Sequence, residues 1–377
     1  MPPVSIRIEA TDGDARVGRL LTPHGVVPTP LFMPVGTYGA VKAMAPDELS
    51  GMGYRMVLAN AYHLALRPGA RLIEELGGLA RFMGFDGAVL TDSGGFQAMS
   101  LARLNSITDD GIRFRSHLDG SPLMLTPEGA VEIQQQLGSD VMMALDDCTP
   151  YPADHGRARA SLELTARWAE RCLRARQNTD QALFGIVQGS VYADLRRLSA
   201  SQITGLDFDG FATGGLSVGE PKAAMREMAA LTVSMLPASK PRYLMGVGTP
   251  ADLIAAIGMG YDMFDCVLPT RNARNGTAFT SAGRVSIKQA VHARDERPLD
   301  ERCDCRPCTS FSRAYLRHLY HAGEILAARA LTEHNLYYYS RLMREARAAI
   351  ASRTYRAFAA HALELMASGR EEQGDHV

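Results

Sequence analysis

Three cysteines crowd into one hexapeptide of this 377-residue sequence. Cys303, Cys305 and Cys308 follow the spacing Cys-x-Cys-x-x-Cys, and thiolates spaced in this way can share one tetrahedral Zn²⁺. An iron–sulfur cluster is disfavoured, because the remaining cysteines belong to predicted strand or helix cores. A closed structural site needs a fourth ligand, and the helical sequence downstream offers His318, His321 and His334. The pattern predicts a structural zinc site and leaves that choice open.

Polar residues also follow several apolar runs at the point where each run ends. Asp92, Asp146, Gln188 and Asp265 occupy such positions, with glycines beside several of them. A single aspartate there is more often the N-cap of the next helix, but several at equivalent positions favour a shared site. Two carboxylates at one site suit nucleophilic and general acid/base chemistry at an anomeric carbon, for which Asp92 and Asp265 are candidates. Asp146 and Gln188 could instead bind the edge of a heterocycle, and residue types alone do not rank these assignments.

These positions converge if the apolar runs are parallel strands of one barrel. The runs are nearly continuous in apolar residues, which is typical of parallel strands covered on both faces. Helical segments separate them, and Thr126-Pro127 and Thr249-Pro250 are good helix start signals. Eight strand–helix units predict an α/β fold, a (β/α)8 TIM barrel, whose active sites form where the carboxyl ends of the strands meet. The predicted strands are 31–35, 55–60, 87–91, 140–145, 182–187, 210–213, 242–246 and 261–264.

A doubly wound sheet is the alternative fold. It usually has fewer units and a glycine-rich phosphate turn after its first strand, and this sequence has no such turn there. Three segments interrupt the strand–helix alternation, at residues 4–30, 111–125 and 274–290. Their turn signals predict antiparallel hairpin insertions on the barrel. Those signals are Asp12-Gly13, Asp119-Gly120, Asn275-Gly276 and Ala282-Gly283.

The pattern also predicts how the chain divides. We expect residues 1–295 to form the catalytic barrel with its N-terminal hairpin. Residues 296–369 hold the cysteine cluster and helix-rich sequence, and they are expected to form a zinc-binding subdomain packed on the barrel. Residues 370–377 are expected to be a disordered tail.

Composition and charge limit which partners and which cellular location the sequence predicts. The formal net charge is −1, so the chain as a whole does not indicate a nucleic-acid partner. Charge is segregated, however, because residues 271–317 contain ten basic and five acidic side chains. That surplus could hold several phosphates or could form an ion-paired, solvated face. No apolar run is long enough to span a bilayer and no signal peptide is recognisable, so we expect a cytoplasmic protein.

As a set, the motifs resemble those of bacterial tRNA-guanine transglycosylases, also called queuine tRNA-ribosyltransferases. They run in family order along nearly the whole chain, which makes the resemblance specific. The matching segments are Pro34–Thr37, Asn60–Leu64 with Arg67–Gly69, Asp92–Gln97, Asp146–Tyr151, Gln188-Gly189, Gly214–Glu220, Gly246–Pro250, Phe264–Gly276, and Cys303–Cys308 with His334.

The resemblance implies an enzyme of queuosine biosynthesis, a homodimeric pentosyltransferase that acts on tRNA. Its reaction replaces the wobble guanine of tRNAs with a GUN anticodon by 7-aminomethyl-7-deazaguanine. By this resemblance, Asp265 is expected to attack the ribose anomeric carbon. Guanine leaves, and Asp92 is expected to be the general acid/base. The covalent ribosyl-aspartate intermediate is then captured by the incoming base, so two displacements retain the configuration.

The resemblance also assigns binding residues. It implies one structural Zn²⁺ per subunit and selects His334 as the fourth ligand. Phe96 and Met245 match residues that sandwich the base. The positions expected to bind the base are Ser93, Gly94, Gly95, Phe96, Asp146, Cys148, Gln188, Gly214, Gly215, Leu216 and Met245. The positions expected to contact RNA are Gly246, Val247, Gly248, Thr249, Pro250, Ala251, Asp252, Thr270, Arg271, Asn272, Ala273 and Arg274.

Two residues favour the bacterial branch of the family. Cys148 follows the aspartate pair, and Val218 lies in the segment Gly-Leu-Ser-Val-Gly. The bacterial branch uses 7-aminomethyl-7-deazaguanine, whereas the eukaryotic branch takes queuine, which needs more room.

Two other classes of protein remain as competing interpretations. A non-catalytic partner subunit should lack the nucleophile, whereas this sequence has both Asp92 and Asp265. A barrel hydrolase acting on nucleosides would not need a zinc subdomain with a basic flank.

Overall fold

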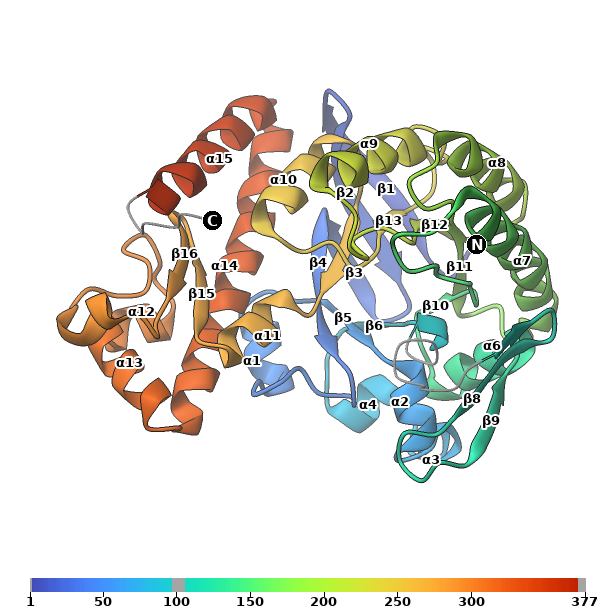
Figure 1. The fold of residues 1–377 in the computed structure, drawn as a ribbon, viewed down its shortest axis with the longest axis horizontal. Coiled ribbons are helices and arrows are strands. Elements are labelled where there is room, and N and C mark those ends of the chain that lie inside the picture. Colours follow the sequence, from blue (N-terminus) through green and yellow to red (C-terminus); the bar gives the residue numbers. More distant parts are fainter. Residues whose placement is uncertain (1, 97–105, 372–377) are drawn as a thin grey trace.

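A computed structural model describes residues 2–96 and 106–371 of the chain (Figure 1). Eight parallel strands close into a barrel in the order β10-β11-β12-β13-β14-β4-β5-β6. The predicted (β/α)8 barrel is therefore confirmed, and every predicted strand is present. The strands are β4 (Leu31–Gly36), β5 (Met56–Ala59), β6 (Ala88–Thr91), β10 (Val141–Met143), β11 (Ala182–Val187), β12 (Gly210–Thr213), β13 (Arg242–Leu244) and β14 (Met263–Cys266).

Helices surround the barrel, and both predicted Thr-Pro start signals act as caps, as does Asp154, which was not predicted as a cap. The side chains of Thr126, Asp154 and Thr249 each accept a hydrogen bond from a backbone amide in the first turn of the helix that follows. The helices between strands are α1 (Pro46–Gly51), α2 (Ala61–Leu66), α3 (Ala70–Glu75), α4 (Leu79–Met83), α6 (Pro127–Leu137), α7 (His155–Ala175), α8 (Ala193–Thr204), α9 (Lys222–Val233) and α10 (Pro250–Gly258).

The N-terminal segment closes the amino end of the barrel. The predicted hairpin gains a third strand and becomes the antiparallel sheet β1 (Ser5–Asp12), β2 (Ala15–Thr22) and β3 (Gly25–Thr29). Leu20 and Val27 of this sheet share one buried cluster with barrel residues such as Met33 and Phe184. Fully burying a side chain of this size contributes about 1.5–3 kcal/mol. With this end filled, a ligand site belongs at the opposite, carboxyl end.

Two further insertions are antiparallel. Strands β8 (Gly111–Arg115) and β9 (Pro122–Leu125) form the expected hairpin, and β7 (Ser106–Thr108) adds a third strand to it. Strands β15 (Thr277–Thr280) and β16 (Gly283–Ser286) form the other hairpin. The signal Asn275-Gly276 does not turn that hairpin but ends helix α11 (Leu268–Arg274), where Asn275 is the C-cap.

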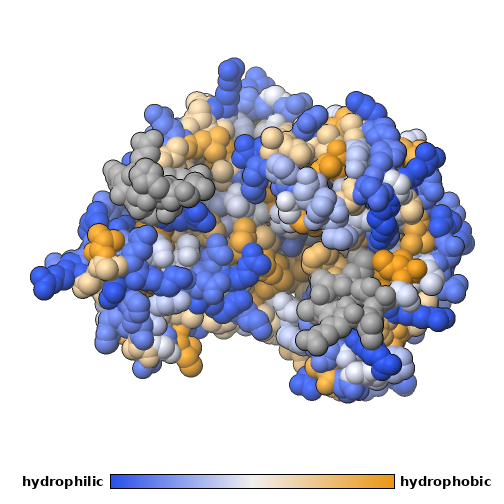
Figure 2. All heavy atoms as spheres, in the orientation of Figure 1, coloured by the Kyte–Doolittle hydropathy of each residue, from blue (hydrophilic) through white to orange (hydrophobic). Residues whose placement is uncertain are grey.

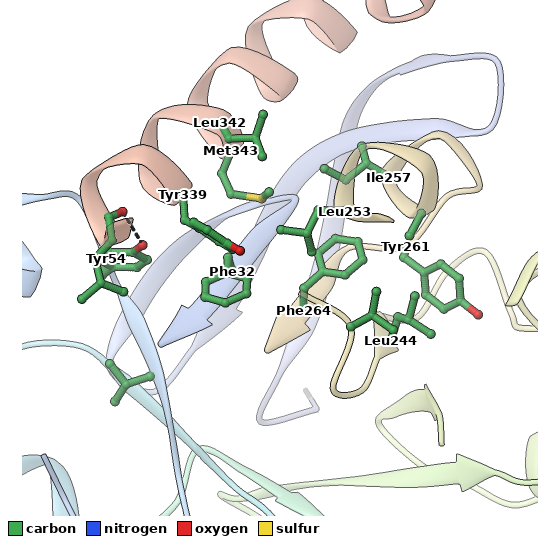
Figure 3. Packing of buried hydrophobic residues seen from close by; sticks show 14 of the residues in the cluster. Phe32, Tyr54, Leu244, Leu253, Ile257, Tyr261, Phe264, Tyr339, Leu342 and Met343 are labelled. Carbon is green, nitrogen blue, oxygen red and sulfur yellow. Dashed lines mark hydrogen bonds between the residues drawn. The ribbon is translucent and has the colours of Figure 1, made fainter. Parts of the chain in front are cut away.

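The C-terminal part is helical, as expected. It contains η1 (Ala290–Arg294), α12 (Arg306–Ser310), α13 (Arg313–His321), α14 (Ile325–Ala351) and α15 (Tyr355–Glu371). Helix α14 joins this part to the barrel, because its Tyr339 ring packs on Phe32 of β4 with centroids 4.8 Å apart. The Tyr54 hydroxyl donates to the Leu336 carbonyl of the same helix at 2.7 Å (Figure 3).

A separate small core lies beside the barrel. It combines Ala278 and Val285 of the β15–β16 hairpin with the cysteine cluster and with Leu331 of α14. Helix α15 continues to Glu371, and the rest of the expected tail lies outside the described residues. Of the helices that the structure describes, none combines the length and apolar character needed to cross a membrane.

Candidate active site and metal site

A cavity of about 380 Å³ opens at the carboxyl end of the barrel strands. Its walls come from residues at or just after the ends of β4, β5, β6, β10, β12, β13 and β14. Asp92, Asp146 and Asp265, which are far apart in sequence, all line it. Figure 2 shows the hollow on this face of the molecule, with apolar residues on its walls.

Asp265 lies within β14 and is held by donors from the neighbouring strand. Its Oδ1 accepts a hydrogen bond from the Tyr243 hydroxyl at 2.6 Å and another from the Gly246 amide at 2.8 Å. Burial raises the pKa of Asp265, and both hydrogen bonds act against that rise because they stabilise the carboxylate. Among the described residues, none donates a hydrogen bond to the other carboxyl oxygen, Oδ2 of Asp265. This oxygen is therefore available to a ligand.

Asp92 follows β6 and receives donors from the end of β5. Its Oδ2 accepts from the Asn60 side-chain amide at 2.6 Å, and its Oδ1 accepts from the Ala61 backbone amide at 2.9 Å. Asn60 also caps helix α2, so one residue both starts the helix and orients the carboxylate. These two donors fix the orientation of the Asp92 carboxyl on the cavity wall.

Asp146 and Gln188 form a buried pair beneath the cavity. The Gln188 side-chain amide donates to Asp146 Oδ2 at 2.6 Å. Burial raises the pKa of Asp146 to about 7, and the hydrogen bond from Gln188 only partly offsets it. Gln188 Oε1 is buried and has no partner among the described residues. The pair can therefore offer carboxylate and amide oxygens to the N–H edge of a heterocycle.

Two glycines make room for that pair. A Cβ on Gly215 would lie 2.2 Å from Gln188 Oε1, and one on Gly214 would lie 2.8 Å from Gln188 Nε2. Gly215 also has a φ of +63°, which side chains rarely adopt. Glycine is required at both positions because the backbone of this turn runs against the Gln188 side chain.

Arg196 of α8 is a site residue that sequence reasoning missed. Its side chain is fully buried, and its guanidinium donates to the carbonyls of Ser190, Val187, Gly214 and Gly215. These carbonyls belong to the last residue of β11 and to the segments after β11 and β12, which carry Gln188 and the two glycines. Asn60 and Tyr243, which orient the two catalytic candidates, were not singled out either. Each of the three looked like an ordinary helix, strand-end or core residue.

Most residues expected to bind the base do surround the cavity. Its walls include Ser93, Phe96, Cys148, Leu216 and Met245, besides the glycines and Asp146. Gly95 packs against Leu145 and Asp146, and Gly94 packs against Tyr62. Gln97 of the same motif lies outside the described residues. Burial raises the pKa of Cys148 to about 12, so this thiol is protonated and is not activated as a nucleophile.

The residues expected to contact RNA divide into exposed and buried sets. Gly246, Arg271 and Arg274 are exposed, and Thr249, Ala251 and Asn272 are half-buried. Asp252 is buried and pairs with Lys222 and Arg226 of α9. The other buried positions are Val247, Gly248, Pro250, Thr270 and Ala273. Side-chain contacts with RNA are therefore possible mainly along the exposed set.

The cysteine cluster meets His334 in the small core. The four candidate ligand atoms all lie within 4.8 Å of one another, and all four residues are buried. His334 Nδ1 is 3.7, 3.4 and 3.3 Å from the sulfurs of Cys303, Cys305 and Cys308. Tetrahedral Zn²⁺ with ordinary bond lengths would separate sulfur and nitrogen by about 3.5 Å. The group fits a tetrahedral metal ion.

A backbone carbonyl orients the histidine. His334 Nε2 lies 2.9 Å from the Phe279 carbonyl of β15, which can only accept a hydrogen bond. Nε2 therefore carries the proton, and the Nδ1 lone pair faces the sulfurs as a metal ligand requires. His318 and His321 lie on α13 and are exposed. The alternative that the spacing left open is decided by this geometry, and the buried group can hold a metal ion.

Comparisons with known proteins agree with this site. The family model described as queuine tRNA-ribosyltransferase matches residues 11–368. Proteins of that name from Caldanaerobacter subterraneus subsp. tengcongensis and from Thiobacillus denitrificans are 57% and 55% identical, over 95% and 93% of this chain. The matches cover 96% and 95% of those relatives. A third, from Symbiobacterium thermophilum, is 54% identical over 96% of this chain and 91% of its own length. This chain belongs to the queuine tRNA-ribosyltransferase family.

Proposed function

We propose that this enzyme exchanges the wobble guanine of GUN-anticodon tRNAs for 7-aminomethyl-7-deazaguanine, a step of queuosine biosynthesis. The observation that carries the proposal is one cavity lined by Asp92, Asp146 and Asp265, with Gln188 bonded to Asp146 beneath it. The two carboxylates suit displacement at a sugar carbon, and the pair suits recognition of a base edge. The family membership of the chain supports the same reaction class, pentosyl transfer on tRNA.

In the first displacement Asp265 is the nucleophile. Oδ2 bonds to the ribose C1′ while the bond from C1′ to guanine N9 breaks, and guanine takes up a proton as it leaves. The donors on Oδ1, Tyr243 and Gly246, hold the carboxylate in place and keep Oδ2 available. Such positioning lowers the barrier because the reacting groups no longer need to find each other in solution.

Asp92 moves the proton in both directions. It delivers a proton to departing guanine and accepts the N9 proton of the incoming deazaguanine. N9 then bonds to C1′, and the ester to Asp265 breaks. The result is net exchange with retained configuration, in which each displacement inverts once. Asn60 and Ala61 support this role because they fix both oxygens of the carboxylate.

The proposed base site lies between Phe96 and Met245. Both line the cavity, and Phe96 is half-exposed there, as a stacking residue at a cavity entrance should be. Asp146 and Gln188 would take the donor edge of the base, with Ser93 and the glycine turn at its other side. Cys148 and Val218 also border the cavity, which is consistent with the smaller bacterial substrate.

We propose that the buried Cys₃His group holds one structural Zn²⁺. With three thiolates and an oriented imidazole, it has the ligand number of a closed site, which leaves no position for substrate. When bound, the ion would join the cysteine segment to β15 and α14. The small core around it includes Ala278 and Val285, so we place the start of the subdomain before β15 rather than at residue 296.

A homodimer is proposed on the family resemblance. Its test is the mass in solution by light scattering over a range of protein concentrations. A mass of one chain at every concentration would contradict it.

The exchange reaction is tested with labelled guanine and unmodified tRNA. We expect label to enter the tRNA, unlabelled 7-aminomethyl-7-deazaguanine to compete, and Asp265→Asn to abolish incorporation. Asp194→Asn, which removes an exposed carboxyl on α8, is the matched control and should leave incorporation intact. Release of guanine without incorporation would instead favour the hydrolase. Binding of tRNA with neither reaction would favour the non-catalytic subunit.

A further inference from the structure

Helix α14 reaches the segment that supports the nucleophile. This support segment, residues 246–249, lies between strand β13 and helix α10 and carries the Gly246 amide that binds Asp265. We propose that Tyr339 of α14 is a positioning residue, whose hydroxyl fixes the support segment and through it the Asp265 carboxylate. The inference rests on the proposed function, since it assumes that Asp265 is the nucleophile.

The support segment is held at three points. At its start the Gly246 amide donates to Asp265 Oδ1 at 2.8 Å. At its end the Thr249 side chain accepts a hydrogen bond from a backbone amide of α10 as the cap of that helix. Between them the Tyr339 hydroxyl donates to the Gly248 carbonyl at 2.5 Å. Only one residue separates Gly248 from Gly246, so a shift of this carbonyl also moves the amide that holds Asp265.

Close packing against the strand of the nucleophile holds the support segment from the other side. A Cβ at Gly248 would lie 2.1 Å from Cβ and 2.8 Å from Sγ of Cys266, the residue after Asp265. Gly248 is buried, and its φ lies outside the left-handed region. Glycine is therefore required here by the close approach to Cys266 and not by the backbone conformation. Gly248 lies between β14 and the Tyr339 hydroxyl, without room to shift toward the strand.

Tyr339 is fixed by its own packing. Its side chain is fully buried, and its ring packs on Phe32 of β4 and Phe279 of β15, with centroids 4.8 and 5.5 Å away. Figure 3 shows the Tyr339 ring beside Phe32. Val247 of the support segment belongs to the same buried cluster. Burial raises the pKa of the Tyr339 hydroxyl well above its usual value, so this group stays protonated and remains a donor.

Loss of this donor should misplace the nucleophile. The buried Gly248 carbonyl would lack its partner, and the support segment would have to shift to reach another one. The hydrogen bond from Gly246 to Asp265 would then lengthen, and Oδ2 would no longer be held for attack, which slows a reaction strongly. The same hydrogen bond lowers the pKa of Asp265 against the effect of burial, so a weaker bond should raise that pKa further. The rate and its pH dependence should therefore change together.

The test is the rate at which the covalent tRNA adduct forms in a single turnover at saturating tRNA, measured across pH. Tyr339→Phe removes the hydroxyl and keeps the ring. We expect adduct formation to be about ten-fold slower. The acid limb of the pH–rate profile should move to higher pH, because a smaller fraction of Asp265 is ionised at a given pH. The KM for the free base should not change, since Asp146 and Gln188 follow other strands.

The matched control is Tyr54→Phe. It also removes one buried tyrosine hydroxyl that donates to a backbone carbonyl, that of Leu336 of α14 at 2.7 Å, but this bond does not involve the support segment. Urea unfolding should show a similar shift of the midpoint in both variants, whereas only Tyr339→Phe should change the rate and its pH profile. Gly248→Ala forces the support segment away from Cys266 and should also slow adduct formation. It keeps the test valid if Tyr339→Phe folds poorly.

Other groups near Asp265 are the same in these variants. The titratable and charged side chains that line the cavity with it are Asp92, Asp146, Cys148, Tyr243, Cys266 and Arg271. A wild-type rate and profile in Tyr339→Phe, or in Gly248→Ala if Tyr339→Phe does not fold, would overturn the role of Tyr339 alone. Equal slowing in Tyr54→Phe would also overturn it, because the rate would then follow stability. Failure of the wild-type enzyme to form an adduct on Asp265 would overturn the proposed function and this role together.

Discussion

Asp265 and Asp146 line the same cavity, but their carboxyl groups accept hydrogen bonds from different sets of donors. Asp265 accepts two hydrogen bonds at one oxygen, whereas Asp146 accepts a single side-chain donor from Gln188. Burial raises the pKa of both, and for Asp146 the pKa reaches about 7. A carboxyl that titrates near neutrality can alternate between accepting and donating a hydrogen bond, so its protonation state matters for recognition of the base.

This difference predicts a pH dependence of base binding. A base edge that presents N–H donors requires ionised Asp146, which exists above its pKa of about 7. The pKa is raised, so protonation begins as the pH falls through about 7 and the KM for the base should then rise by up to about ten-fold per pH unit. The measurement is the KM for the base between about pH 6 and 8.5 at saturating tRNA.

Asp146→Asn serves as the control for this profile. It should bind the base weakly at every pH and remove the rise below pH 7. A wild-type KM that stays flat, or that rises with increasing pH, would show that Asp146 does not accept the base as a carboxylate.

Arg196 predicts a linked loss of stability and base affinity. Arg196→Met fills a similar volume but leaves four buried carbonyls without their donor, which should cost about 2–4 kcal/mol in free energy of unfolding. Because two of these carbonyls belong to Gly214 and Gly215, the KM for the base should rise while the KM for tRNA stays constant. Arg196→Lys should restore part of both losses. Urea unfolding and steady-state kinetics measure the two effects, and equal changes in both KM values would contradict the assignment.

At the scale of residues, the sequence identified the candidate reacting groups but not the residues that hold them in place. Asp92, Asp265 and the cysteines stand out because their types are unusual at strand ends or in clusters. Tyr243 is part of an apolar strand, and its hydroxyl reaches Asp265 only through the closed barrel. Arg196 looks like an ordinary polar residue of a helix, although its side chain is fully buried. Such roles depend on long-range contacts that local pattern does not encode.

At the scale of elements, helix α14 connects the Cys₃His group to the barrel. It carries His334 toward the cysteines and Tyr339 toward Phe32 of β4. Asn335 of the same helix accepts from the Phe279 amide and donates to the Pro269 carbonyl of α11. The helix thereby holds β15 and α11 in register with each other, and α11 carries Arg271 at the cavity.

Metal removal should therefore unfold the subdomain before it affects the barrel. After chelation, or in Cys305→Ser, we expect faster amide hydrogen exchange in β15–β16 and in residues 299–334, with the barrel strands still protected. Exchange measured by mass spectrometry separates the two regions. Cys172→Ala is the control, since Cys172 is buried in α7, in a different core from the Cys₃His group. Loss of catalysis with every region still protected would indicate a catalytic metal instead.

The elements also show where pattern reasoning succeeds. Buried parallel strands are nearly continuous apolar runs, so the barrel strands were predicted close to their observed bounds, and the two Thr-Pro signals do begin helices. Turn signals were less specific. Asn275-Gly276 is hairpin chemistry in isolation, but here it ends α11 because the next strand pairs beyond it. The third strands β3 and β7 were missed, since short edge strands carry little pattern.

At the scale of the whole molecule, the barrel brings together residues that are far apart in the chain. Asp92 and Asp265 are separated by about half of the sequence, yet both line one cavity because the carboxyl ends of parallel strands face one way. The closed amino end leaves the carboxyl end for substrate.

The central claim is that Asp265 forms a covalent bond to the tRNA ribose. The most direct measurement is a denaturing gel of enzyme mixed with unmodified tRNA and quenched during turnover, followed by peptide mapping of the adduct. We expect a tRNA-linked band with the ribose on Asp265. Asp265→Asn should give no band, and Asp92→Asn should still bind tRNA. An adduct that maps to another residue, or that persists in Asp265→Asn, would contradict the account.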